Sequence, residues 1–403
     1  MDPVRAQYEA YPYPERDPEE ERRRLIVGSP SDPVEIDHFL FRGRRDWREP
    51  FRALVAGGGT GDGLIQLAQR LKDAGCPAEI TYLDLSAAAR AVAEARARVR
   101  DLNNIRFLTG DLMMAPELGS FDYVDCCGVL HHLEAPKAGM AALAASLAPE
   151  GGMGLMVYAP YGRTGVYALQ EGFGALFAGD LPAEKLRLAR EAVGALPPTN
   201  WFLHNPFLSD HRASDAGLYD LLLHARDRPF DVASLAGALA GAGLGLVSFL
   251  EPARYDPLRY LPAGEAFRAR VAALDPLARM ALAERLAGDM RLHIAYVTRA
   301  GREGEVMARP GPEAVPRLNR LPARALAETV AKRGEVVIDY PGAKYRVAMP
   351  REAARLIAAI GGRPLGELAR AAGLDWIAFA QHWAPVHRGL TGFNRLHYSG
   401  FPA

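Results

Sequence analysis

An apolar run that stops in a cluster of glycines constrains this 403-residue chain more than any other feature. Residues 53–56 (Ala-Leu-Val-Ala) lead into residues 57–63 (Gly-Gly-Gly-Thr-Gly-Asp-Gly), and the apolar pattern resumes at Leu64. This pattern predicts a strand, a tight turn and a helix. Glycine lets the backbone approach a ligand closely or adopt positive φ, and the first turn of a helix offers unpaired N–H groups. The turn therefore predicts a site for a nucleotide-like cofactor.

The spacing of the glycines narrows the choice of cofactor. The dinucleotide pattern G-x-G-x-x-G fails when it is started at Gly57, because its last position is Asp62, and the later registers fail in the same way. A kinase-type P-loop is excluded because no Gly-Lys-Ser/Thr follows. The pattern that remains is G-x-G-x-G at Gly57, Gly59 and Gly61. It resembles motif I of the class I S-adenosylmethionine-dependent methyltransferases.

The elements that follow strengthen this resemblance. A β-branched segment ends in Asp84, a third strand leads into Asp111, and a fourth strand over 121–127 leads into Leu-His-His-Leu at 130–133. The resemblance implies that Asp84 binds the ribose and that Asp111 binds the adenine, although Asp84 with Ser86 also suits the cap of the next helix. The implied cofactor is S-adenosylmethionine, with S-adenosylhomocysteine as product. The implied contacts are Gly57, Gly58, Gly59, Gly61, Asp84, Leu85, Asp111, Leu112 and Gly128.

One position departs from the family pattern. Most members carry an acid just before the glycines to support the methionine end of the cofactor, and this chain has Val55 there. The resemblance then leaves the amino group to another acid, such as Asp62, or to the N-terminal segment. A non-catalytic, S-adenosylmethionine-binding regulatory protein stays open as an alternative.

The remaining strands predict the fold class and the domains. Strands five, six and seven are expected at 151–158, 245–250 and 291–297. The resemblance implies an α/β, Rossmann-like methyltransferase sheet of seven strands, mostly parallel, with an antiparallel seventh strand. We expect a lid segment over 1–45, the methyltransferase domain over 46–300, and a helical insertion over about 162–243. Ligands bind at the carboxyl ends of strands in such sheets, so the insertion is expected to cap the acceptor.

Three groups of residues are expected at the acceptor. Tyrosines among prolines at 8–14 resemble the N-terminal lids of some methyltransferases, although they also suit the covering of a core edge. Segments 158–167 and 221–231 carry aromatic and arginine side chains suited to carboxylate or phosphate, although an Arg-Asp-Arg set also suits a salt-bridged corner. The candidate substrate-binding residues are Tyr11, Tyr13, Tyr158, Tyr161, Arg163, Arg226 and Arg228.

A hydroxyl or protonated amine acceptor needs a base to remove its proton. His131, His132 and His224 are the candidates, because an imidazole with a pKa near 6.5 suits that task, and only one of them need act. Their alternative role is to hydrogen-bond loop backbone beside the pocket. With three cysteines, two of them adjacent at Cys126 and Cys127, no metal site of the usual zinc spacing is expected.

The C-terminal part of the chain differs in character. A linker rich in glycine and proline is expected over 301–330, and a small α+β module of winged-helix type over 331–403. Its hairpin is expected to turn at Pro341-Gly342-Ala343. A protein partner or self-association is expected there, and nucleic acid is not, because no basic-aromatic stripe is present.

The composition is that of an ordinary globular protein. Lys+Arg and Asp+Glu are both 48, and apolar stretches are too short to span a membrane. We expect a cytoplasmic enzyme of bacterial type that transfers a methyl group in line to an O, N or C acceptor. A small molecule bound under the insertion is the expected acceptor. The alternative is a protein methyltransferase that docks its substrate through the C-terminal module.

Overall fold

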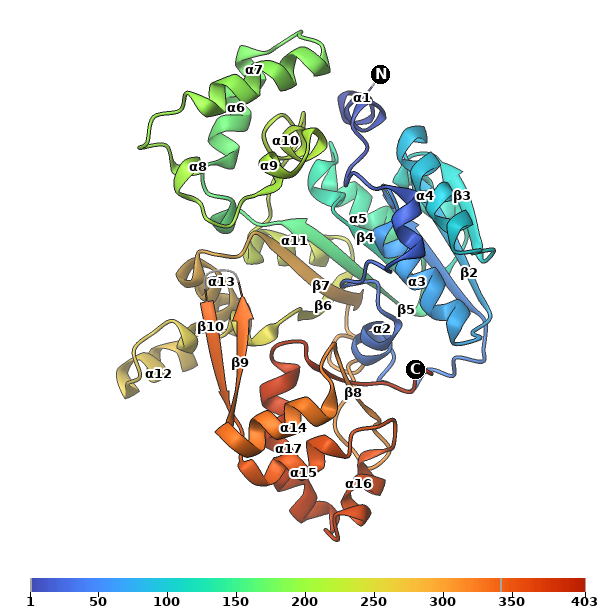
Figure 1. The fold of residues 1–403 in the computed structure, drawn as a ribbon, viewed down its shortest axis with the longest axis vertical. Helices are drawn as coiled ribbons and strands as arrows, with labels where there is room; N and C mark the ends of the chain where they lie inside the picture. Colours follow the sequence, from blue (N-terminus) through green and yellow to red (C-terminus); the bar gives the residue numbers. More distant parts are fainter. Residues whose placement is uncertain (1, 341–342, 403) are drawn as a thin grey trace.

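A seven-stranded sheet organises the chain in the computed structural model, which describes residues 2–340 and 343–402. The strand order is β3-β2-β1-β4-β5-β7-β6, and β7 is antiparallel to both of its neighbours (Figure 1). The strands are β1 (Phe51–Ala56), β2 (Ala78–Asp84), β3 (Ile105–Thr109), β4 (Phe121–Cys127), β5 (Leu147–Tyr158), β6 (Leu244–Phe249) and β7 (Leu292–Arg299). The predicted fold class and its seven strands are confirmed.

Helices cover both faces of the sheet because successive strand residues point to opposite sides. On one face, Leu54 and Val124 pack with α5 (Pro136–Ala145), α11 (Val232–Gly241) and α13 (Pro276–Ala287). On the other face, Val55 and Tyr123 pack with α2 (Pro33–Leu40), α3 (Asp62–Asp73) and α4 (Ala87–Val99). Helices on both faces and the strand order β3-β2-β1-β4-β5 are those of a doubly wound sheet. The carboxyl ends of β1, β2, β4 and β5 therefore lie together at one edge of the sheet.

The glycine turn between β1 and α3 has the geometry that its sequence requires. Gly57, Gly59 and Gly61 all have positive φ, at 72°, 51° and 99°. A Cβ at Gly57 would lie 2.2 Å from a methyl group of Val129 on the loop after β4. Both conditions favour glycine, so the alternate spacing follows from the backbone path.

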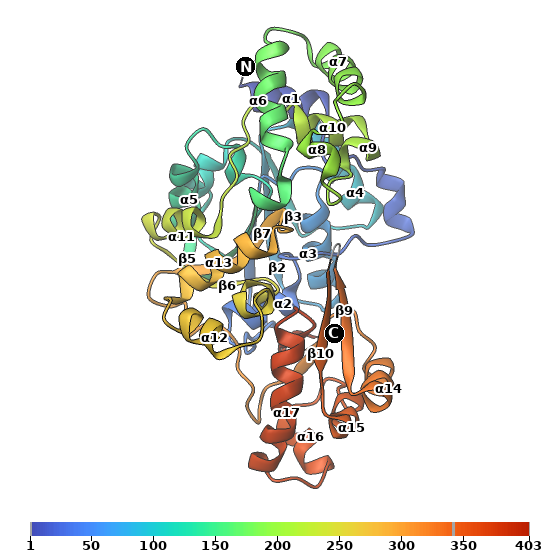
Figure 2. The same cartoon turned by 90° about the vertical axis from the view of Figure 1, so that its left-hand side faces the viewer.

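The insertion between β5 and β6 is a helical layer with its own apolar cluster, which includes Phe173, Phe202 and Leu222. In Figures 1 and 2 it lies with the N-terminal helix beyond the carboxyl ends of the strands. Its helices are α6 (Val166–Leu176), α7 (Pro182–Gly194), α8 (Trp201–His204), α9 (Asp210–Ala213) and α10 (Asp215–Leu222).

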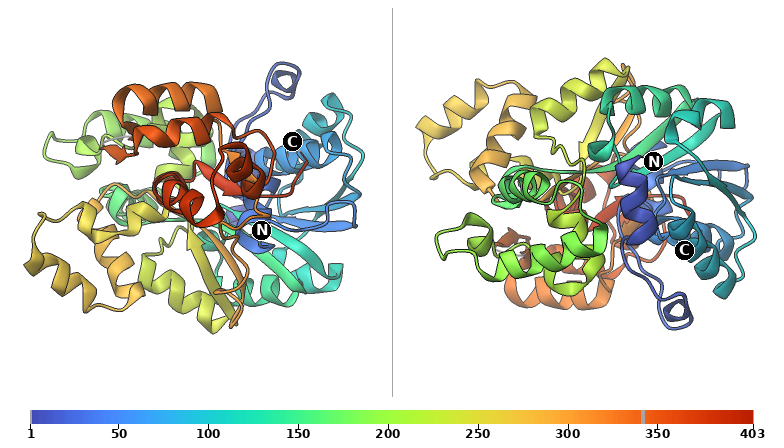
Figure 3. Two further views of the ribbon diagram at one scale, coloured as in Figure 1. Left: turned by 90° about the horizontal axis from the view of Figure 1, so that it is seen from below. Right: turned by 90° about the horizontal axis from the view of Figure 1, so that it is seen from above.

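The N-terminal segment crosses the same edge of the sheet. Helix α1 (Pro3–Ala10) lies between the insertion and α4 when the molecule is seen from above (Figure 3, right). The carboxylate of Glu9 accepts hydrogen bonds from the Ala87 and Ala88 N–H groups at 2.8 and 3.1 Å, so it caps α4. Further along, Thr60 Oγ1 donates to the Pro14 carbonyl at 2.7 Å. The segment is therefore fixed across the glycine turn.

The C-terminal module differs from its expected boundaries. Strand β8 and helix α14 lie where a linker was predicted, and Leu326 and Val330 of α14 are buried in the core of the module. The linker prediction over 301–330 is therefore wrong in part; the amphipathic repeat of 323–333 was the missed signal. The elements are β8 (Pro316–Leu318), α14 (Ala323–Arg333), β9 (Glu335–Tyr340), β10 (Ala343–Ala348), α15 (Ala354–Ala358), α16 (Leu365–Ala371), α17 (Trp376–Thr391) and β11 (Leu396–Tyr398).

The hairpin β9–β10 is present, and the expected turn at Pro341-Gly342 lies outside the described residues. Strand β8 pairs with β11, which closes the module beside the helices. The winged-helix type stays a prediction. The remaining elements are α12 (Glu265–Ala272) and the short 3-10 segments η1 (Pro18–Arg22), η2 (Leu112–Leu118), η3 (Leu130–His132), η4 (Tyr161–Arg163), η5 (Pro252–Tyr255), η6 (Pro257–Arg259) and η7 (Arg351–Ala353).

The residues after β11 return to the methyltransferase sheet. Ser399 Oγ donates to buried Asp37 of α2 at 2.7 Å, and the Phe401 ring meets Trp47 edge-on with centroids 4.9 Å apart. Phe401 belongs to the same apolar cluster as β1. The module and the sheet therefore share buried contacts. Among the described residues, no helix combines the length and apolar character needed to cross a membrane.

Candidate functional site

A cavity of about 790 Å³ lies at the carboxyl ends of β1, β2, β4 and β5. The glycine turn and the loops after β2 and β3 form one end, and α1, Tyr158 and the start of the insertion form the other. All nine predicted cofactor contacts line it, namely Gly57, Gly58, Gly59, Gly61, Asp84, Leu85, Asp111, Leu112 and Gly128. The structure thus gathers them around one space of the size that a nucleoside-type ligand needs.

Asp84 is held firmly at the end of β2. Its two carboxylate oxygens accept hydrogen bonds from the Gly59 and Ser86 N–H groups, each at 2.8 Å. Burial raises the pKa of Asp84, while these backbone bonds oppose the shift. Two of the four acceptor positions of the carboxylate remain, which matches the two hydroxyls of a ribose. Ser86 caps α4 through the Ala89 N–H, so the helix cap and the carboxylate that lines the cavity occur together.

Asp111 lies at the next turn, where β3 ends. One of its oxygens accepts from the Met113 N–H at 2.9 Å, which fixes the start of η2. The side chain is exposed and lines the cavity, so its second oxygen is available to a donor such as an exocyclic amine.

A buried polar network closes the opposite end of the cavity. Tyr8 and Tyr158 each donate a hydrogen bond to Asp220 of α10, at 3.1 and 2.9 Å. Burial raises the pKa of Asp220 and of both phenols. The guanidinium of Arg163 lies 3.7 Å above the Tyr158 ring and pairs with Asp227 at 3.2 Å. Every polar group of this network is therefore oriented by another.

Of the three candidate histidines, only His132 lines the cavity. Its Nδ1 must donate to the Arg226 carbonyl at 2.9 Å, because a carbonyl cannot donate, so Nε2 keeps its lone pair. Burial lowers the pKa of His132 to about 4, and the nearby Asp227 charge partly opposes this shift. His132 is therefore a neutral proton acceptor at neutral pH.

His224 and His131 are behind His132. The ring of His224 stacks on His132 with centroids 3.6 Å apart; its Nδ1 accepts from the Arg226 N–H and its Nε2 lies 3.2 Å from the Tyr8 hydroxyl. His131 is fully buried, and its Nδ1 accepts a long hydrogen bond of 3.4 Å from the Tyr158 N–H. Both support the site from outside the cavity.

The expected substrate contacts divide into two groups. Tyr13, Tyr158, Arg163 and Arg226 line the cavity. Three others do not line it, and their role as substrate contacts stays a prediction. Tyr11 stacks on Tyr219 of the insertion at 5.1 Å, Tyr161 lies beneath Arg285 at 5.8 Å, and exposed Arg228 donates to the Glu134 carbonyl at 3.3 Å.

Residues 54–153 match a family model described as a methyltransferase domain. The chain carries a class I S-adenosylmethionine-dependent methyltransferase domain. S-adenosylmethionine is the cofactor of this domain, and the free acceptor positions of Asp84 suit its ribose.

Similar proteins extend beyond this methyltransferase domain. An uncharacterised protein of Synechococcus sp. is 32% identical over 249 residues, which are 58% of this chain and 57% of the relative, so the chain spans little more than half of that protein. The structure of PKMT2 from Rickettsia typhi aligns with a TM-score of 0.61 and 13% identity over 92% of this chain and 75% of PKMT2. The complex of PKMT2 with AdoHcy aligns with a TM-score of 0.58 and 12% identity over 87% of this chain and 72% of that one. These structures share the fold.

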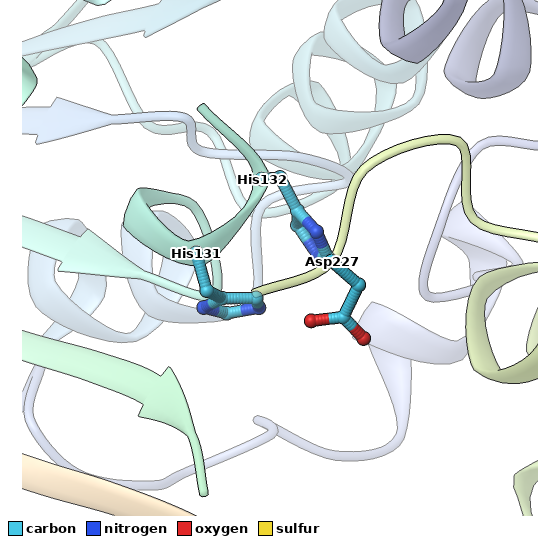
Figure 4. A group of neighbouring side chains, drawn as sticks. All are labelled: His131, His132 and Asp227. Atoms are coloured by element: carbon cyan, nitrogen blue, oxygen red, sulfur yellow. The ribbon is translucent and has the colours of Figure 1, made fainter. Parts of the chain in front are cut away.

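Two groups of side chains in the methyltransferase domain come close enough to hold a metal ion, within the described part of the chain. The first is His131, His132 and Asp227 (Figure 4), and the second is His132, Asp220 and His224. In each group one imidazole already uses its Nδ1 lone pair on a backbone N–H, so its Nε2 carries hydrogen. One imidazole and one carboxylate remain, which is fewer than the three protein ligands of a catalytic zinc site.

Several residues that line the cavity are missing from the candidate lists, among them the polar residues Tyr8, Asp125 and Asp220. Asp125 lies in the apolar strand β4, and Asp220 lies in the apolar helix α10. An acid inside an otherwise buried element was the available signal, because burying a charge is costly unless it has a partner.

Proposed function

We propose that the chain transfers a methyl group from S-adenosylmethionine to a nitrogen or oxygen atom of an acceptor bound under the helical insertion. One observation carries this proposal: a single cavity joins the glycine turn and Asp84 to the buried cluster of His132, Tyr8 and Tyr158. When bound, S-adenosylmethionine supplies an electrophilic methyl group on its sulfonium.

His132 is the proposed base. It accepts the acceptor proton at Nε2, because the Arg226 carbonyl holds the imidazole in the tautomer that leaves this atom free. The lowered pKa keeps His132 unprotonated throughout the neutral range. His224 holds the ring from behind by stacking and has no separate chemical role.

Tyr8, Tyr158 and Asp220 position the acceptor. Because Asp220 accepts from both phenols, their oxygens keep fixed directions and offer lone pairs to an acceptor hydroxyl or ammonium. Together with α1 and the insertion they exclude water from the reacting atoms, which limits hydrolysis and strengthens polar contacts.

Two other functions are kept in view. A protein acceptor is the first alternative, in which the C-terminal module docks the substrate; the fold shared with PKMT2 covers 92% of this chain and so includes part of that module. A regulatory protein that binds the cofactor without turnover is supported by Val55 at the position of the usual acid.

The test uses S-adenosylmethionine with a labelled methyl group. Purified protein is incubated with the small-molecule filtrate and, separately, with the macromolecular fraction of a cell extract. Label in the filtrate supports a small acceptor, label in the macromolecular fraction supports a protein acceptor, and no S-adenosylhomocysteine from either fraction contradicts an enzyme. Removal of residues 302–403 is a poor test, because Ser399 and Phe401 complete buried contacts of the sheet.

A further inference from the structure

The end of β1 lacks the expected acid, but the neighbouring strand supplies one. Val55 of β1 pairs in parallel register with Asp125 of β4, and both residues line the cavity. Asp125 is only 1% exposed, and among the described residues its carboxylate has one hydrogen-bond partner, the hydroxyl of Ser31. Burial raises the pKa of Asp125 to about 6. A buried carboxylate with so little compensation is expected to have a cationic ligand.

A second polar group on the same wall has an unused donor. Gln66 of α3 is 1% exposed and lines the cavity. Its Oε1 accepts from the Gly28 N–H at 2.6 Å, and this obligate donor fixes the orientation of the amide. The Gln66 Nε2 is then buried without a partner among the described residues. Buried amide donors rarely stay unpaired, so an anionic or carbonyl oxygen is expected there.

Asp125 and Gln66 both belong to the wall of the cavity beside the start of α3. A Cβ at Gly63, in the first turn of α3, would lie 3.4 Å from Asp125 Oδ2 and 2.4 Å from Ser31 Oγ. Gln66 follows Gly63 by three residues and therefore shares its helix face. A free carboxylate and a free amide donor on adjoining elements are complementary to the ammonium and carboxylate of an α-amino acid group.

Asp62, which the sequence offered for this purpose as an alternative to the N-terminal segment, already has partners. It accepts from Arg16 at 2.6 Å and from Arg96 at 2.7 Å. Burial pushes the pKa of Asp62 up, but these arginines outweigh burial and leave it lowered. Its charge is therefore offset without a ligand.

We propose that Asp125 binds the α-ammonium of the methionine part of the cofactor and that Gln66 binds its α-carboxylate. This assignment rests on the proposed function only in its choice of cofactor. Asp125 on β4 thereby takes the place of the acid that most family members carry on β1. The Ser31 hydroxyl holds the Asp125 carboxylate in place. The acid that binds the ammonium has then moved from the position of Val55 on β1 to Asp125 on β4, and it has not been lost.

The test compares two ligands by calorimetry on the full chain. S-adenosylhomocysteine carries the amino acid group, and 5′-methylthioadenosine lacks it. We expect Asp125→Asn to weaken S-adenosylhomocysteine binding by about 10- to 100-fold, the range for lost charged hydrogen bonds, while binding of 5′-methylthioadenosine is unchanged. Gln66→Met keeps the length of the side chain and should give a smaller loss with the same selectivity.

The control is Asp84→Asn, which should weaken both ligands. Unchanged 5′-methylthioadenosine binding also shows that Asp125→Asn is folded; if that variant does not fold, the Gln66→Met comparison decides. Equal losses for both ligands, or full S-adenosylhomocysteine affinity in both variants, would overturn the assignment while leaving the proposed function intact. If the unaltered protein binds neither ligand, the cofactor and this assignment are both wrong.

Discussion

The two ends of the cavity are built in different ways. The cofactor end takes its predicted contacts from the turns after β1, β2, β3 and β4, each at the carboxyl end of a parallel strand. The acceptor end joins Tyr8 of α1, His132 of η3 and Asp220 of α10, and 212 residues separate the hydrogen-bonded pair Tyr8 and Asp220. Local turns and strand order determine the first end, whereas tertiary packing determines the second.

The two ends also differ in how their hydrogen bonds are used. Asp84, Asp125 and Gln66 keep acceptor or donor positions free, so a ligand adds bonds there. At the acceptor end, Tyr8 and Tyr158 already donate hydrogen bonds to Asp220. We therefore expect substitutions at the cofactor end to change affinity, and substitutions at the acceptor end to change rate.

The largest effect is expected from His132→Asn. Loss of the base should lower kcat by about 10²- to 10⁴-fold, the usual contribution of general base catalysis, with unchanged affinity for S-adenosylhomocysteine. Single-turnover rates and calorimetry measure the two quantities. The matched control is His204→Asn, an exposed histidine on α8, which should change neither. An equal fall in kcat and in affinity for S-adenosylhomocysteine would mean that His132 contributes to both the cofactor end and the acceptor end of the cavity.

A loss of affinity is expected from Asp84→Ala. Removal of the carboxylate should weaken S-adenosylmethionine binding by about 1.5–3 kcal/mol, the scale of hydrogen bonds to a charged group. At saturating cofactor, kcat should stay near its original value. Unchanged affinity in calorimetry would contradict the ribose assignment and, with it, the contrast between the two ends.

His224→Ala should have a smaller effect than His132→Asn. His224 lies outside the cavity and acts through the position of the His132 ring and the Tyr8 hydroxyl. We expect kcat to fall by about 10-fold, equivalent to one modest hydrogen bond, without loss of cofactor affinity. His224→Phe restores a stacking ring and should recover part of the rate. A loss as large as that of His132→Asn would make His224 the base.

The smallest effect on catalysis is expected from Glu35→Gln. Glu35 is not among the residues that line either end of the cavity. Glu35 is buried among Ser29, Tyr296 and Asn394, and burial raises its pKa to about 7 from 4.5. Its contribution to stability is therefore full below about pH 4.5 and is lost as the pH rises through 7. The variant lacks this titration.

Thermal unfolding at several pH values between 5 and 8 measures this effect. The melting temperature of Glu35→Gln should rise relative to that of the unaltered protein as the pH rises. The kcat and the affinity for S-adenosylhomocysteine should stay the same. A constant difference between the two proteins would show that Glu35 stays neutral, or stays charged, over the whole range.

The contrast between the two ends of the cavity also explains which of its residues could be predicted from the sequence. The seven strands and the residues that line the cofactor end of the cavity were predictable, because apolar runs, glycine spacing and strand-end acids are local patterns. The sequence did not show that Tyr8, and not Tyr11, lines the cavity, because the face of α1 that meets the insertion depends on helix docking. Asp125 was overlooked because its role depends on lying beside Val55 of β1. The pairing of two strands cannot be read from the sequence of one of them.

The return of the chain after β11 has a consequence for biosynthesis. Buried Asp37 and His38 of α2 find partners in the Ser399 hydroxyl and the Tyr398 N–H, and the Phe401 ring fills the cluster beside Trp47. The methyltransferase sheet therefore lacks part of its interior until residues 398–401 have left the ribosome. Its strands are complete roughly 100 residues earlier, so a growing chain passes through a stage in which the catalytic domain has its topology but not its final packing.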